Sequence, residues 1–249
     1  MTQPHARFVE LKAALVRAVN ELYDHGLVTP TGGNLSVRCP DGDHILITAS
    51  QVYKGALGPE HILEVDLSGR VVETPGWPGP IPGVGPGGAA APATMRESGT
   101  GDTSRLRPSI ETGMHLAIYA ARADVEAVVH THAPLASVWS LYDEPVPPLT
   151  IDAVRFTDIR TVPFAPPGSS ELATSTAEAL ARSPAVLLRN HGLVTVGADL
   201  RQAVNTALAL EEALKVAILA RLLAGGLAGR EPALIPPRAA DFLRKLLVG

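Results

Sequence analysis

The sequence predicts an α/β protein in which a mixed sheet of eight or nine strands is covered by helices on both faces. Short strand patterns bounded by Gly, Pro, Asn and Asp alternate with amphipathic helical patterns along the 249 residues. Apolar residues make up 46% of the chain, which is enough for a sizeable core. The length fits one large domain or two small ones, and the continuous pattern favours a single domain over 1–249.

Composition also limits the class of protein. The formal net charge is −4 and no basic stripe is present, which argues against a nucleic-acid partner. Cys39 is the single cysteine, so no intrachain disulfide can form, as suits a reducing compartment. The first ten residues do not resemble a signal peptide, and the apolar run 216–227 is too short and interrupted to span a bilayer. We therefore expect a cytoplasmic protein without a membrane partner.

The N-terminal third predicts one helix and four strands. Phe8, Leu11, Leu15 and Leu22 recur at helical spacing, and Gly26 is placed to end that helix. The predicted strands form two hairpins, at 35–38 with 44–48 and at 62–67 with 70–73.

The segment Gly32-Gly33-Asn34 has two interpretations. It is either a plain loop that leads into the first strand or a nest of backbone N–H groups that holds an anion.

Residues 74–105 differ from the rest of the chain. Eleven of the fourteen residues in 75–88 are Gly or Pro, a composition that buries too little apolar surface to offset the entropy of ordering. We predict a flexible insertion on the surface of the domain. The alternative is a lid that becomes ordered over a substrate.

The C-terminal half supplies the remaining elements. A helix follows Pro108-Ser109-Ile110-Glu111, and an apolar strand at 125–129 leads into His130. Further patterns predict helices at 134–141, 171–182 and 199–223, and strands at 160–164, 185–189 and 193–196.

Three histidines stand at strand ends. His130 and His132 are one residue apart, so in an extended chain both side chains fall on the same face. His191 also follows an apolar strand. A histidine in such a place is often a polar residue with an ordinary partner, but the H-x-H pair together with His191 favours a metal site. The other histidines are interpreted as structural or exposed, although His115 shares a helix face with Glu111: His5, His25, His44, His61 and His115.

Four motifs in order resemble the class II aldolase/adducin family: Gly32-Gly33-Asn34-x-Ser36, Pro108-Ser109-x-Glu111, His130-x-His132 and Asn190-His191-Gly192. The resemblance covers about residues 8–223, apart from the insertion. It implies a largely antiparallel sheet and a divalent metal, most often zinc, on His130, His132 and His191. It implies Glu111 as acid/base, and sometimes as an additional ligand. It further implies a homotetramer with active sites at subunit interfaces.

The chain also departs from the sugar-phosphate members of that family. Their phosphate-binding positions are matched here by Gly33, Asn34, Ser50 and Ser109, but Gln51 replaces a glycine and Ile110 replaces a serine. Ile110 removes a hydroxyl donor where an anion would lie, and a buried dianion without its donors is costly. The tyrosine that protonates the leaving group in the aldolase has no counterpart near Thr150-Ile151.

These observations predict a divalent-metal-dependent carbon–carbon lyase. We expect it to act on a non-phosphorylated hydroxy or oxo acid, by decarboxylation or retro-aldol cleavage through a metal-stabilised enolate. The alternatives are a sugar-phosphate aldolase or epimerase, oxygenase-type chemistry at iron, and a non-catalytic adducin-like module. Zinc is the expected metal, and manganese and iron fit the same ligands.

Overall fold

The computed structural model describes residues 3–72, 106–226 and 232–248, so the predicted insertion at 74–105 lies outside the described residues. Seven strands form one sheet in the order β3-β2-β1-β4-β7-β6-β5. All neighbouring pairs are antiparallel except β5–β6, which is parallel. The strands are β1 (Asn34–Arg38), β2 (His44–Thr48), β3 (Ile62–Asp66), β4 (Ala127–Thr131), β5 (Arg160–Val162), β6 (Ala185–Leu188) and β7 (Gly192–Gly197).

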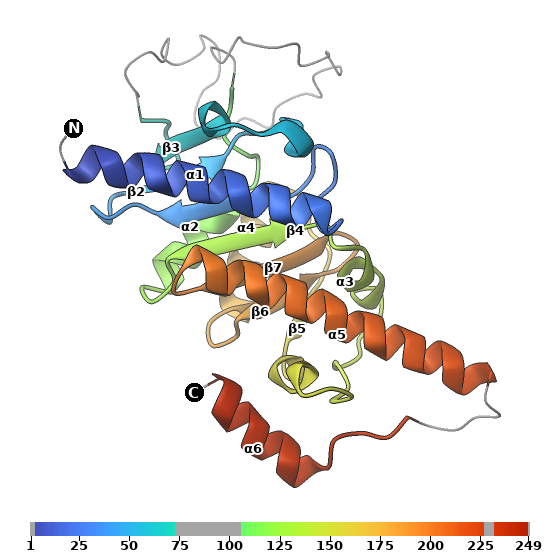
Figure 1. Cartoon of the computed structure of the whole chain (residues 1–249). Helices are drawn as coiled ribbons and strands as arrows, with labels where there is room; N and C mark the ends of the chain where they lie inside the picture. The colour runs from blue at the N-terminus through green and yellow to red at the C-terminus, as the bar shows by residue number, and fades with distance from the viewer. Residues whose placement is uncertain (1–2, 73–105, 227–231, 249) are drawn as a thin grey trace.

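Helices cover both faces of this sheet (Figure 1). The α-helices are α1 (Gln3–Asp24), α2 (Thr112–Ala121), α3 (Pro134–Trp139), α4 (Ser170–Ala179), α5 (Leu200–Gly226) and α6 (Pro237–Val248). Short 3-10 turns lie at η1 (Lys54–Ala56), η2 (Pro59–His61) and η4 (Asp152–Phe156). The order of elements follows the alternation of strand and helix patterns in the sequence.

The two faces have separate hydrophobic cores. One core contains Leu15 of α1, Leu210 of α5 and Val129 of β4. The other contains Ile118 of α2, Leu172 of α4 and Val128 of β4. Because side chains alternate along a strand, His130 faces the same side as Val128, toward α2. Asn34 and Ser36 of β1 also face that side, since Leu35 and Val37 belong to the first core.

The predicted mixed sheet with helices on both faces is confirmed, but the expected eight or nine strands are wrong. The described residues form seven. The extra strand was expected at 70–73, where Val71 makes only an isolated bridge to Val65 after the turn at Gly69. A single bridge leaves residues 70–72 without a ladder, so the described part of that segment forms no strand.

Several element boundaries also differ from the sequence prediction. The fourth strand runs from Ala127 to Thr131 instead of 125–129, so His130 is part of the ladder. The helix α6, at 237–248, was not predicted. Within the described part of the chain, no helix combines the length and the apolarity needed to cross a membrane.

Candidate active site

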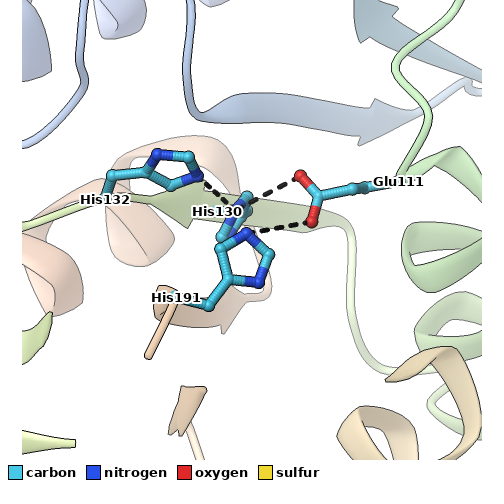
Figure 2. A group of neighbouring side chains, drawn as sticks. All are labelled: Glu111, His130, His132 and His191. Carbon is cyan, nitrogen blue, oxygen red and sulfur yellow. Dashed lines mark hydrogen bonds and ion pairs between the residues drawn. The ribbon is translucent and has the colours of Figure 1, made fainter. Parts of the chain in front are cut away.

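Four side chains converge at one end of the central strands (Figure 2). His130 lies in β4, His132 just follows it, His191 lies in the turn between β6 and β7, and Glu111 directly precedes α2. One ligand atom from each of these residues lies within 4.8 Å of the others. The structure therefore brings together the three histidines and the carboxylate that the sequence singled out.

The turn that carries His191 depends on its two neighbours. Asn190 has φ +59°, a left-handed conformation that asparagine tolerates better than most residues. A Cβ at Gly192 would lie 2.2 Å from the Thr131 carbonyl oxygen, so only glycine fits against β4 there. Both requirements explain the motif Asn190-His191-Gly192 physically, because the turn must be tight to place His191 beside β4.

The glycines of the first loop have a comparable role. A Cβ at Gly32 would lie 2.6 Å from Nδ1 of His132, and Gly33 has φ +84°. The loop therefore packs directly against the His132 ring. This contact explains why residue 32 is a glycine without any role in binding an anion. The predicted role of the loop in substrate binding stays a prediction.

Hydrogen bonding defines which nitrogen of His130 faces the centre. Nδ1 lies 3.0 Å from the Leu193 carbonyl oxygen, which can only accept, so Nδ1 carries the proton. Burial lowers the pKa of His130 to about 4, which leaves the ring neutral near pH 7. Its Nε2 lone pair then faces Oε2 of Glu111 at 3.3 Å and Nε2 of His132 at 3.2 Å.

Glu111 is enclosed by these groups. Its side chain is buried, with Oε1 3.3 Å from Nε2 of His191. Burial raises the pKa of Glu111, but positive charge beside the imidazoles of His130 and His191 and the hydrogen bond from the Asn34 amide lower it, and the net direction is downward. The carboxylate is therefore ionised near neutral pH.

This arrangement fits a cation. A neutral imidazole lone pair and a carboxylate oxygen 3.3 Å apart repel each other unless a positive charge lies between them. Three imidazoles and one carboxylate are ligands that zinc, manganese and iron accept. His130 has the hydrogen bond from its second nitrogen to a carbonyl that metal-binding histidines ordinarily make.

The residues predicted to contact substrate lie beside this centre. Asn34 and Ser109 are buried, whereas Gln51 and Ile110 are exposed. Asn34 is buried, and its amide donates to Oε2 of Glu111 at 2.8 Å. Ser109 accepts from the Glu111 backbone N–H at 3.3 Å. Ser50 donates its backbone N–H to Arg107, which places Ser50 and Gln51 next to the turn before Glu111. Ile110 and Gln51 are exposed there.

Lys54 is a feature of this region that sequence reasoning missed. Its side chain is only 1% exposed, and its backbone N–H binds the Pro30 carbonyl of the first loop. Burial lowers the pKa of Lys54 to about 8. The pKa of His132 is lowered mainly by burial and by His191, with the smallest contribution from the Lys54 ammonium. No carboxylate among the described residues pairs with it. A lone lysine in Val52-Tyr53-Lys54-Gly55 gives no signal of burial.

The fold and the site together are those of an α/β protein with a candidate metal site, formed by three histidines and one carboxylate at the end of a mixed sheet. The chain belongs to the family described as Class II Aldolase and Adducin N-terminal domain, whose pattern matches residues 13–218. This membership confirms the resemblance drawn from the four motifs.

Relatives of known name support the same placement. The chain is 31% identical over 198 residues to an L-fuculose phosphate aldolase of Methanococcus maripaludis, covering 79% of this chain and 90% of the relative. It is 28% identical over 214 residues to a 3-oxo-tetronate 4-phosphate decarboxylase of Escherichia coli, covering 83% and 85%. A solved L-fuculose 1-phosphate aldolase superposes with a TM-score of 0.75 at 26% identity and covers 95% of both chains.

Proposed function

We propose that the protein is a divalent-metal-dependent lyase that cleaves a carbon–carbon bond next to a carbonyl group. The observation that carries this proposal is the Glu111 carboxylate, which faces two of three convergent imidazoles at 3.3 Å. A carboxylate held beside a Lewis-acid site is what proton transfer during such a cleavage requires. An adducin-like binding module has no use for this arrangement.

The proposed ligands of the metal are His130, His132 and His191, with Glu111 as a further ligand when no substrate is bound. A bound divalent cation would supply Lewis-acid stabilisation of the negative charge that develops on a substrate oxygen. Zinc is the proposed metal, and manganese and iron are the alternatives. Metal analysis of protein purified without added metal decides among them.

Glu111 is the proposed acid/base. In retro-aldol cleavage it takes the proton of the substrate hydroxyl as the C–C bond breaks and returns a proton to the carbon that receives the electron pair. In decarboxylation the electron pair of the broken bond stays on the α-carbon and carbon dioxide leaves; Glu111 takes a proton from water, which leaves hydroxide to the solvent, and delivers that proton to the same carbon. Both reactions place the proton donor within hydrogen-bond reach of the same carbon.

We further propose that the substrate is a non-phosphorylated hydroxy or oxo acid. Gln51 and Ile110 offer no hydroxyl at the exposed edge of the site, and Ile110 presents an apolar side chain that is 62% exposed. Lys54 supplies one buried positive charge, which suits a carboxylate with a single negative charge. The test compares pairs of substrates that differ only in a phosphate group.

A phosphorylated substrate is the second candidate, and the comparisons favour it. The named relatives act on fuculose phosphate and on 3-oxo-tetronate 4-phosphate. Gln51 has φ +59°, so the backbone there keeps a conformation that glycine favours. Efficient cleavage of a phosphorylated member of each substrate pair, at a kcat/KM above roughly 10⁴ M⁻¹s⁻¹, would establish this candidate over the first.

The proposed assembly is a homotetramer. Exposed apolar side chains lie on α6 and on the C-terminal part of α5, among them Phe242, Leu246, Leu222 and Leu223. Such exposed apolar side chains on two helices suit burial against another subunit. Light scattering of the purified protein measures the mass directly.

A further inference from the structure

His115 lies one turn after Glu111 on α2 and its side chain is fully buried. Both ring nitrogens are engaged: Nε2 lies 2.6 Å from Oδ1 of Asn34, and Nδ1 lies 2.7 Å from Oγ of Ser36. Asn34 and Ser36 are alternate residues of β1 that face α2, which is why one imidazole reaches both. The ring is enclosed and cannot touch a substrate.

Hydrogen bonds extend from His115 in both directions. Toward the metal-type centre, the Asn34 amide donates to Oε2 of Glu111 at 2.8 Å. Away from it, the Ser36 hydroxyl lies 2.9 Å from the hydroxyl of Tyr119, one turn further along α2. Five buried side chains are thus joined in one chain: Glu111, Asn34, His115, Ser36 and Tyr119.

Only one arrangement of protons satisfies all the hydrogen bonds among these five side chains. An ionised Glu111 can only accept, so the Asn34 NH₂ group faces it and the Asn34 oxygen faces His115. Nε2 of His115 must therefore carry a proton. Burial lowers the pKa of His115 to about 3, so the ring is neutral and its Nδ1 accepts from Ser36. The Ser36 oxygen then accepts from Tyr119.

We infer that His115 is a positioning residue, which holds the Asn34 amide in the one orientation that presents an N–H to the Glu111 carboxylate. This inference rests on the proposed role of Glu111. If the Asn34 amide were flipped, its oxygen would face the carboxylate, and the two acceptors would repel each other. His115 prevents that flip by donating from Nε2, and Ser36 fixes the tautomer that can donate.

Two variants distinguish the loss of the hydrogen bond to Asn34 from the loss of the histidine side chain as such. His115→Leu removes both hydrogen bonds, whereas His115→Gln keeps an N–H that can reach Asn34. We expect His115→Leu to lower kcat by roughly 10- to 100-fold with a smaller change in KM, because the Glu111 carboxylate that Asn34 orients moves a proton in the reaction. His115→Gln should recover most of that loss, and both variants should keep bound metal.

Controls distinguish this from a general loss of stability. Thr206→Val removes a buried hydroxyl that donates to the Gln202 carbonyl oxygen on α5, a helix that packs in the core on the other face of the sheet. It should lower the melting temperature without changing kcat. Because His115 acts through Asn34, the double variant with Asn34→Ala should lose little more than the worse single variant. Equal losses in His115→Leu and His115→Gln, or additive losses in the double variant, would overturn the inference.

A second measurement does not depend on catalysis. In ¹⁵N-histidine-labelled protein, the His115 signals should show a protonated Nε2 and an unprotonated Nδ1 near neutral pH, with or without bound metal. A protonated Nδ1 would overturn the inference whatever reaction the protein performs. Absence of lyase activity together with the expected tautomer would instead remove the proposed function and leave the hydrogen-bonded chain in place.

Discussion

The inner and outer parts of the site are built differently. The inner part contains His130, Glu111, Asn34 and His115, all buried and joined by hydrogen bonds or short contacts. The outer part contains Gln51 and Ile110, both exposed and without side-chain hydrogen bonds among the described residues. The inner part is fixed by the sheet and α2, so its chemistry is constrained. The outer part can change residue type at little cost, which is where substrate preference can diverge.

Removing a proposed ligand should have the largest effect of any change in the inner part. His191→Ala should lose bound metal and essentially all activity while the fold persists, because His191 lies in a turn outside both cores. The measurement is metal content together with circular dichroism. His44→Ala, at a half-buried histidine beside Asp41, is the matched control and should keep both metal and activity. A His191→Ala protein with stoichiometric metal excludes this residue as a ligand.

Glu111→Gln tests the acid/base role with less disturbance. The substitution keeps the size of the side chain but removes the ionisable group. Turnover should fall by about 100-fold or more, with only a modest change in substrate binding. Steady-state kinetics measure both, and Glu64→Gln on β3 serves as a control at a carboxylate outside the site. Turnover near that of the wild type would make Glu111 a helix-start residue only.

Lys54 belongs to neither part as defined above. Its side chain is buried like the inner part, but it lies in the short 3-10 turn η1, outside the sheet and α2. Lys54→Met should raise KM for an anionic substrate by roughly 10-fold, because a buried positive charge near His132 is lost. The pKa of Lys54 is about 8, so the ammonium is present below that pH, and kcat/KM of the wild type should fall as the pH rises through 8. That fall should be absent in Lys54→Met. Lys215→Met, at an exposed lysine on α5, should change neither value.

Much of the inner part can be predicted from the sequence, and the contacts that cannot be predicted have a physical reason in common. His130, His132 and His191 stand at strand ends, where period-two alternation and tight turns leave a sequence signal. The contact between Asn34 and His115 left no such signal, because it joins residues 81 apart through strand and helix packing. The sequence predicts a structural or exposed role for His115, and only three-dimensional packing shows its burial between two partners. The burial of Lys54 has the same explanation.

The outer part supplies the test of substrate class. Ile110→Ser combined with Gln51→Gly restores a hydroxyl and places glycine at a position where φ is +59°. Phosphate-ester binding should improve by about 1–3 kcal/mol if the hydroxyl and the backbone donors both contact the anion. Turnover of a non-phosphorylated acid should change little, since the inner part is untouched. Inhibition constants for a phosphorylated and a non-phosphorylated analogue, measured on both proteins, give the comparison. If the wild type already binds the phosphorylated analogue better, and the double variant gains nothing, the outer part already holds a phosphate and the substrate is a phosphate ester.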